Sequence, residues 1–280
     1  MRIQLECPTC VVMQMTHIFE HQENESSVWP QITRRVFEQI APLWSTADNP
    51  GEIIAHMATV MAHQAGTADL YMKDKHHANQ LTEKYWRDHA VPIEDWHSRL
   101  LYAAAGNSID AGLSKDAGSN IAQIDQFIEQ GLARNDSLQF FQQVPPPAHI
   151  LYWLDNAGEA VLDREFIRAL RHRGYTVTAV VRRRPFLNDL TYSEACGIQL
   201  EDAASDVITG EELEIHPQEF LDAYRADGLI SKGIAHWERL SHRDFRQPAL
   251  FIYRAKCPPS ARWAQVQWND NVACYYPRSV

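Results

Sequence analysis

Residues 149–159 have the sequence HILYWLDNAGE, in which an apolar run is followed directly by polar residues. Its first six residues are mostly apolar and follow three prolines, a pattern that predicts a buried strand. Polarity changes abruptly at Asp155 and Asn156, and residues 160–173 have the character of a helix. In open α/β sheets, ligands bind at the carboxyl edge of the strands, where the next helix begins with free N–H groups. A carboxylate and an amide are therefore expected at a ligand-binding edge.

Asp155 and Asn156 have two interpretations at this edge. Carboxylate and amide oxygens are hard ligands that suit magnesium, manganese or a similar divalent ion. Either side chain also suits the N-cap of the helix that follows. The residues after the other predicted strands favour the ligand interpretation.

Four further strands are predicted after the first, at residues 175–181, 206–208, 228–231 and 249–255, with helices between them. The pattern is that of a small doubly wound sheet, whose strand ends meet at one edge if the strands are parallel. Chemically useful residues follow each of the five strands: Asp155 and Asn156; Arg182, Arg183, Arg184, Asn188 and Asp189; Thr209 and Gly210; Lys232 and Gly233; Lys256 and Cys257. Taken one at a time, each of these residues has an ordinary explanation: it caps a helix, forms a turn or is a solvated arginine. Their common position is typical of a binding site.

Two carboxylates and an amide can hold one divalent ion and leave positions open for water and a phosphate oxygen. A lysine and the backbone N–H groups beside glycine would then neutralise a phosphoryl group. These groups indicate a metal-dependent phosphatase. The sequence lacks the G-x-G-x-x-G and G-x-x-x-x-G-K-[ST] fingerprints, which argues against dinucleotide cofactors and P-loop hydrolysis.

The first half of the chain is predicted to be almost entirely helical. Apolar stripes at helical spacing, such as Ile53, Met57 and Val60, predict a bundle core. The proline-containing segment before residue 149 suggests a boundary between a helical domain, residues 1–145, and a Rossmann-like α/β domain, residues 146–280. Asn107 and Asp110 follow a buried helix and are expected to reach the site from the side, with purely structural partners as the alternative.

Composition limits the classes of partner. The formal net charge is −10 and the sequence pI is about 5.7, so neither a nucleic acid nor an anionic membrane surface is expected as a partner. No stretch approaches the roughly 18 apolar residues of a membrane span, and the apolar run at residues 11–15 is too short for a signal peptide. A cytoplasmic protein with a small phosphorylated metabolite as its partner is expected, and the oligomeric state stays open.

Five cysteines in a chain without a secretion signal indicate reduced thiols. Cys7 and Cys10 have a C-x-x-C spacing at the head of a predicted helix, but a zinc site needs two more ligands. Of the other three cysteines, Cys257 and Cys274 are the plausible thiols to complete one. A structural metal at Cys7, Cys10 and Cys257, a redox pair and inert buried thiols all stay open.

The combined motifs resemble the family catalogued as domain of unknown function 89, now described as metal-dependent damage-control phosphatases, in its branch with an N-terminal Cys-x-x-Cys. The matching segments run through nearly the whole chain: Glu6-Cys7-x-x-Cys10, Asp69-x-Tyr71 with Lys75 and Asn79, Ala105-Gly106-Asn107-x-Ile109-Asp110, Leu154-Asp155-Asn156-Ala157-Gly158-Glu159, Val181-Arg182 with Pro185-x-Leu187-Asn188-Asp189-x-Thr191, Ser231-Lys232-Gly233 and Ala255-Lys256-Cys257. The resemblance implies an α/β fold, in which a helical N-terminal domain packs on a Rossmann-like α/β/α sandwich with a mostly parallel sheet.

The resemblance also implies a divalent metal (manganese, cobalt, nickel or magnesium) held by Asp155, Asn156 and Asp189. Asp155, Asp189, Lys232 and Asn107 would be catalytic, with Asn107 and Lys232 on the phosphate and Asp110 supporting the site. The wider substrate-binding set would also include Glu159, Arg182, Arg183, Asn188, Gly233 and His236. The implied reaction is hydrolysis of small phosphomonoesters, such as sugar phosphates or related damaged phosphometabolites.

This chain departs from the family pattern at several positions: Leu70 for proline, Arg183 for glycine, Leu190 for a small residue, Glu194 for aspartate, and Ala235-His236 for Gly-Asn. Arg183 and His236 are expected near the phosphate, so the departures bear on substrate choice more than on metal binding. A metal-oriented water is the expected nucleophile, with Asp155 or Asp189 as a covalent alternative. Carboxyl methylation dependent on S-adenosylmethionine and non-catalytic metabolite binding are the rival functions.

Overall fold

Seven strands form one sheet in the order β1-β7-β6-β5-β2-β3-β4 in this computed structural model, which describes residues 1–21, 28–109 and 121–276. The strands are β1 (Arg134–Asn135), β2 (His149–Trp153), β3 (Thr176–Val181), β4 (Asp206–Thr209), β5 (Gly228–Lys232), β6 (Ala249–Arg254) and β7 (Asn271–Tyr276). The five strands from β6 to β4 run parallel, whereas β7 is antiparallel to β6. The predicted strands and their parallel arrangement are confirmed, but β1 and β7 were not predicted.

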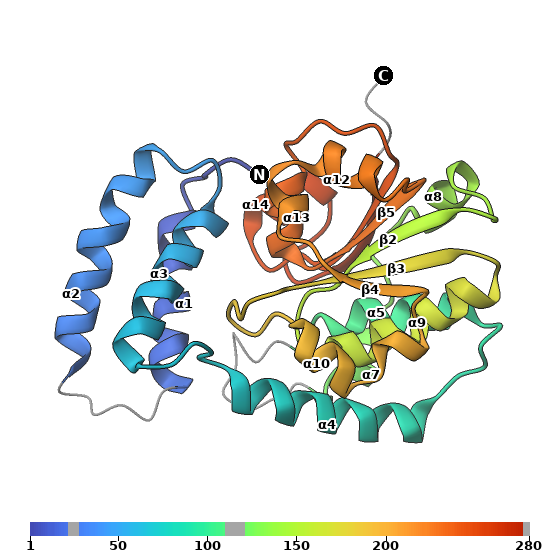
Figure 1. Cartoon of the computed structure of the whole chain (residues 1–280), viewed down its shortest axis with the longest axis horizontal. Helices are drawn as coiled ribbons and strands as arrows, with labels where there is room; N and C mark the ends of the chain where they lie inside the picture. Colours follow the sequence, from blue (N-terminus) through green and yellow to red (C-terminus); the bar gives the residue numbers. More distant parts are fainter. Residues whose placement is uncertain (22–27, 110–120, 277–280) are drawn as a thin grey trace.

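Helices cover both faces of the sheet (Figure 1). The helical segments are α1 (Cys7–His21), α2 (Trp29–Ile40), η2 (Ala41–Ser45), α3 (Pro50–Ala65), α4 (Met72–His89), α5 (Trp96–Gly106), α7 (Ile124–Gln130), α8 (Ser137–Gln143), α9 (Glu159–His172), α10 (Tyr192–Gly197), η3 (Leu200–Asp202), α11 (Glu212–Ile215), α12 (Pro217–Ala223), α13 (Ile234–Leu240) and α14 (Pro258–Ala264). The α/β fold with a mostly parallel sheet and helical N-terminal segments is thereby confirmed.

The alternation of side chains along β2 divides the core into two layers. Ile150 and Tyr152 point to one face, where they pack with residues of α5 and α9. Leu151 and Trp153 point to the other, where they pack with residues of α12, α13 and α14. Successive residues of a strand face opposite sides, so a strand that is apolar throughout must lie between two helical layers.

The first three long helices, α1 to α3, share a separate cluster of buried side chains and lie beside the sheet (Figure 1). By contrast, α5 and α8 contribute side chains to the core of the sheet itself. The domain boundary at residue 145 stays a prediction. Within the described residues, no helix is long and apolar enough to cross a membrane.

The strand order reverses at β2, because β3 and β4 lie on one side of it and β5 lies on the other. In doubly wound sheets, such a switch point opens a crevice at the carboxyl ends of the two strands. Here the residues that follow are Asp155 after β2 and Gly233 after β5. The topology therefore brings two of the predicted strand ends to the place where a ligand is expected.

The fold has a specific packing requirement at Gly210, which follows β4. A methyl group there would lie 2.6 Å from Val180 Cγ1 and 2.7 Å from Phe220 Cζ. We expect Gly210→Ala to lower the free energy of unfolding by about 1–3 kcal/mol through overpacking. Urea denaturation measures this change. Gly197→Ala is the matched control, because a methyl group at Gly197 meets no atom within 4 Å. Equal stability of the two variants would contradict the packing described here.

Candidate active site

Asp155 and Asp189 lie together because the loops after β2 and β3 pair through their backbones. Leu190 N donates to Asp155 O at 2.8 Å, and Ala157 N donates to Asn188 O at 2.9 Å. Asn156 and Asp189 form an isolated antiparallel bridge between these contacts. Both carboxylates are buried, with 5% of Asp155 and 4% of Asp189 exposed. Two acidic residues that are 34 positions apart in the sequence thereby share one buried edge.

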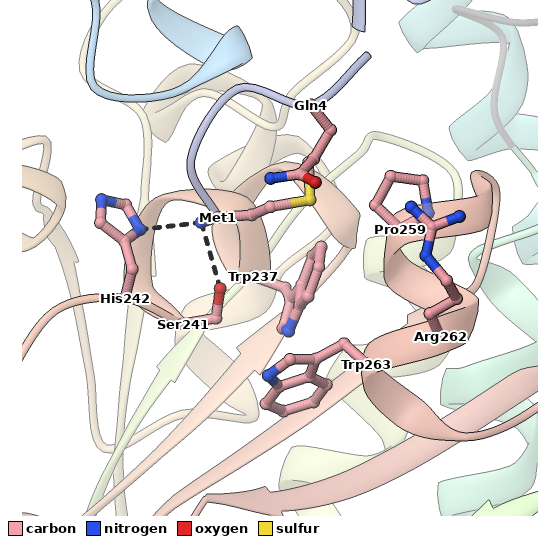
Figure 2. A pocket seen from close by; sticks show the side chains of 8 residues that line it. All are labelled: Met1, Gln4, Trp237, Ser241, His242, Pro259, Arg262 and Trp263. Carbon is pink, nitrogen blue, oxygen red and sulfur yellow. Dashed lines mark hydrogen bonds between the residues drawn. The ribbon is translucent and has the colours of Figure 1, made fainter. Parts of the chain in front are cut away.

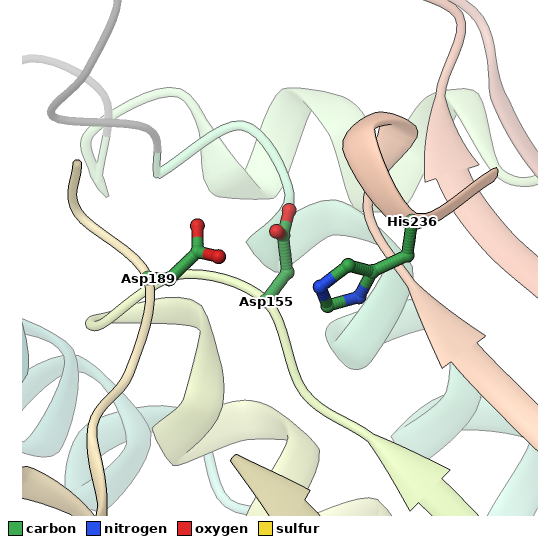
Figure 3. Close-up of side chains that lie close together, drawn as sticks. All are labelled: Asp155, Asp189 and His236. Atoms are coloured by element: carbon green, nitrogen blue, oxygen red, sulfur yellow. The ribbon is translucent and has the colours of Figure 1, made fainter. Parts of the chain in front are cut away.

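His236 completes this group from the first turn of α13. Its ring stacks on Trp153, with the ring centroids 3.5 Å apart and the planes at 10°. One ligand atom each from Asp155, Asp189 and His236 lie within 4.8 Å of one another (Figure 3). Among the described residues, this is the one group of three or more histidine, cysteine or acidic side chains compact enough to hold an ion.

Arg182 at the end of β3 supplies positive charge to the group. Its Nε donates to Asp189 Oδ2 at 2.8 Å, and its Nη2 lies 3.4 Å from His236 Nε2. Glu214 accepts from Arg182 and also pairs with Arg239 Nη1 at 2.6 Å. Glu214 therefore offsets two buried guanidinium groups beside the carboxylates.

These surroundings change the protonation of the buried groups. Burial raises the pKa of Asp189, and the attraction of Arg182 offsets only part of that rise. Burial lowers the pKa of His236 well below its usual range, and the positive charges of Arg182 and Arg239 lower it further. His236 is therefore a neutral imidazole, the form that ligates metals.

The donor set fits a divalent metal. Two carboxylates and a neutral imidazole are common ligands of first-row transition ions. Gly233 leaves room for the Asp155 carboxylate. A methyl group at Gly233 would lie 1.8 Å from Asp155 Oδ2, and the φ of Gly233 is +79°. A residue with a side chain at this position would displace the carboxylate.

Lys232 lies at the end of β5, and its side chain is fully buried beneath this edge. Its Nζ donates to Ala103 O and to Asp163 Oδ1, both at 2.7 Å, and lies 3.4 Å from Glu159 Oε1. These three acceptors match the three protons of an ammonium group. The contact of Lys232 with phosphate stays a prediction, and it would require exchange of one acceptor.

The buried acids beside Lys232 interact electrostatically with its ammonium group. Burial raises the pKa of Asp163 to about 7, although Lys232 attracts the ionised form. Burial would lower the pKa of Lys232, but Asp163 and Glu159 outweigh it, so the pKa is raised. Tyr152 OH also donates to Asp163 Oδ1, at 2.6 Å. Lys232 therefore stays charged.

Asn107 connects this network to the metal-ligand candidates. Its Nδ2 donates to Glu159 Oε2 at 2.7 Å and lies 3.4 Å from Asp155 Oδ2, while its Oδ1 accepts from Arg254 N at 2.9 Å. The amide is therefore held at both ends, and the catalytic role of Asn107 on the phosphate stays a prediction. Asp110, which was predicted to support the site, lies outside the described residues.

Of three other predicted site residues, Asn156 and Asn188 are buried and Arg183 is exposed. Asn156 is buried, and its Nδ2 donates to Asp155 Oδ2 at 3.1 Å. Asn188 is buried and contributes the carbonyl that holds the loop. The side chain of Arg183 is 61% exposed and lies 3.6 Å from Glu212, outside the buried group. Its role in substrate binding stays a prediction.

The cysteines do not assemble into a comparable group in the described part of the chain. Cys7 is buried, Cys10 is exposed and Cys257 is half-buried. The structure therefore gives no support to the structural metal that was one interpretation of the cysteine spacing.

Several residues at the site were not predicted. Asp163, Glu214 and Trp153 each contact a predicted site residue, and Arg239 pairs with Glu214. Asp163 had a signal, since it follows Glu159 by four positions and therefore shares its helix face. Glu194 pairs with Lys75 at 2.6 Å and Thr191 Oγ1 donates to it at 2.8 Å, which gives the departure at position 194 a structural role.

A separate surface pocket of about 290 Å³ lies where the N-terminal segment meets α13 and α14 (Figure 2). The residues that line it are Met1, Gln4, Trp237, Ser241, His242, Pro259, Arg262 and Trp263. None of these was predicted to bind metal or phosphate, and the lining contains no carboxylate. The chemistry therefore points to the buried edge and not to this pocket.

Comparison with known proteins gives the family. The fold places this chain among the doubly wound α/β proteins, which bind ligands at the switch point of the sheet. Acidic side chains lie at that point here. The family model for the damage-control phosphatase ARMT1-like domain matches residues 3–272, and the chain belongs to this family.

Curated relatives match this chain over nearly the whole length of both sequences. The chain is 25% identical to a damage-control phosphatase of Archaeoglobus fulgidus, covering 98% of this chain and 99% of the relative. It is 26% identical to damage-control phosphatase PH1575 of Pyrococcus horikoshii, covering 95% of each. The crystal structure of the latter, described as a DUF89 family protein, superposes with a TM-score of 0.80 over 98% of both chains at 24% identity, which supports the fold.

The network around Lys232 makes a prediction about stability. Removing one partner of a buried ion pair costs about 3–5 kcal/mol, because the other charge remains uncompensated. We expect Lys232→Met to lower the free energy of unfolding by about that amount in urea denaturation, and Asp163→Asn added to it to restore part of the loss. Lys84→Met, at an exposed position of α4, is the control and should change stability by less than about 0.5 kcal/mol. Similar stabilities of Lys232→Met and Lys84→Met would refute the network.

Proposed function

We propose that this chain is a divalent-metal-dependent phosphatase that hydrolyses small phosphomonoesters, among them sugar phosphates or related damaged phosphometabolites. The observation that carries the proposal is the buried group of Asp155, Asp189 and His236 at the carboxyl edge of the sheet. Membership of the damage-control phosphatase family supports the reaction class. The net charge of −10 favours a small substrate that meets local positive charge over a polyanion.

Asp155, Asn156 and Asp189 would hold the metal. When bound, the ion supplies Lewis-acid chemistry to a phosphoryl oxygen. Arg182 is the nearest guanidinium, and its partner Glu214 fixes its position beside Asp189. In this proposal, Arg182 offsets the negative charge that a phosphate brings to the two carboxylates.

Asn107 and Lys232 contribute from below the edge. Asn107 donates toward Asp155 and Glu159, so it orients the carboxylate that would ligate the metal. Lys232 places a fixed positive charge next to Glu159 and Asp163, which keeps the buried acids from repelling a phosphate. We assign the attack to water, with an aspartyl nucleophile as the alternative, because Asp155 and Asp189 already accept from Asn156 and Arg182 in positions suited to ligands.

Methyl transfer is not favoured, since the matching relatives are named as phosphatases. Non-catalytic binding of metal and metabolite would be distinguished by turnover. A cytoplasmic location and a boundary at residue 145 remain predictions from the sequence, as does the unsupported structural metal at Cys7, Cys10 and Cys257.

We expect Asp155→Asn and Asp189→Asn each to reduce metal-dependent hydrolysis of para-nitrophenyl phosphate by about 100-fold or more, since loss of a supporting residue alone costs about 10–100-fold. The protein is first stripped with a chelator, and each divalent metal is then restored in turn. Asp206→Asn is the matched control, because Asp206 is exposed at the opposite end of β4.

Undiminished turnover in the Asp155 and Asp189 variants would refute the proposed site. Metal binding by the wild-type chain without turnover of para-nitrophenyl phosphate or of a panel of phosphometabolites would favour the sensor function instead.

A further inference from the structure

His236 brings a second kind of ligand atom to the proposed metal site. One ligand atom each from His236, Asp155 and Asp189 lie within 4.8 Å of one another. The two carboxylates offer hard oxygens, whereas the imidazole offers a nitrogen. A cation bound among them would therefore meet a mixed set of ligand atoms.

The surroundings of His236 fix the ring instead of leaving it to solvent. The residue is fully buried, and its imidazole lies flat on Trp153, which ends β2 two residues before Asp155. Figure 3 shows the ring beside Asp155, with Asp189 on the far side of that carboxylate. A ring held by stacking loses little rotational freedom on ligating an ion, so this packing favours binding.

The polar contacts of the ring leave it available. Nε2 meets Arg182 Nη2 at 3.4 Å, which is a long contact, while the same guanidinium holds Asp189 and Glu214 more closely. An ion that enters the group would replace this one long contact and leave the other two in place. The backbone of Lys232 is a further polar group that faces the ring.

We propose that His236 is a nitrogen ligand of the metal, together with Asp155 and Asp189, and that it shifts the metal preference of this chain from magnesium toward cobalt, nickel or zinc. The proposal rests on the proposed function, because it concerns the same site. Carboxylate and carbonyl oxygens suit magnesium and manganese, whereas imidazole suits zinc, nickel and copper. One nitrogen among the ligands therefore changes the selectivity of an otherwise oxygen-only site.

Two measurements on the full-length protein test the proposal. Pulsed electron paramagnetic resonance of bound Mn²⁺ reports a directly coordinated nitrogen, which should be present in the wild type and lost in His236→Asn. Calorimetric titration with Ni²⁺ and Mg²⁺ gives the selectivity. We expect His236→Asn to weaken Ni²⁺ binding by about tenfold or more and to change Mg²⁺ binding by less than about threefold.

His172→Asn is the matched control. His172 is exposed at the last turn of α9, about 20 Å along that helix from the end at which Asp155 lies. This variant should retain the nitrogen signal and the wild-type selectivity. His236→Ala tests whether the effect comes from loss of nitrogen, since it too should lose the signal.

The outcomes separate this inference from the proposed function. If wild-type protein binds none of these metals, the proposed metal-dependent function fails, and the inference fails with it. If wild-type protein binds metal but shows no coordinated nitrogen, or if His236→Asn keeps the wild-type preference for nickel over magnesium, the inference is wrong while the phosphatase proposal stands.

Discussion

The site depends on the backbone pairing of two loops, one after β2 and one after β3. The hydrogen bonds of Leu190 N with Asp155 O and of Ala157 N with Asn188 O are the physical link. Without them, the loop after β3 would be free to carry Asp189 away from Asp155, and repulsion between two buried carboxylates would favour that separation. Asn79 adds a third anchor from α4, because its Oδ1 accepts from Gly158 N at 2.6 Å. The scaffold thus imposes on two acids a proximity that their charges oppose.

Compensation of charge explains the other buried polar residues. On one side, Arg182 and Arg239 share Glu214 and offset Asp189. Beneath the edge, Lys232 offsets Glu159 and Asp163. Buried ions are tolerated only when they are paired and their remaining hydrogen bonds are satisfied, so each group limits what its neighbours can be. A substrate phosphate and a cation would enter a site whose charges are already arranged in pairs.

The sequence predicted the parallel strands and the acids at their ends because both signals are local. A run of apolar residues followed by Asp155 is visible without knowing the partner strand, and the parallel order then brings the ends together. The short β1 and the antiparallel β7 escaped prediction, since their pairing depends on distant segments. Asp163 and Glu214 escaped for a similar reason, because their importance comes from the charges of Lys232 and Arg182 across the fold. His236 was predicted at the phosphate edge, but its stacking on Trp153 is visible only in three dimensions.

We propose that Asp155 and Asp189 together form a metal site. Anomalous scattering from crystals of the chelator-stripped protein, soaked in Mn²⁺, locates a bound ion. We expect a peak about 2.0–2.4 Å from an oxygen of each of these two carboxylates. A peak elsewhere, such as at Cys7 and Cys10, with none between Asp155 and Asp189, would contradict it.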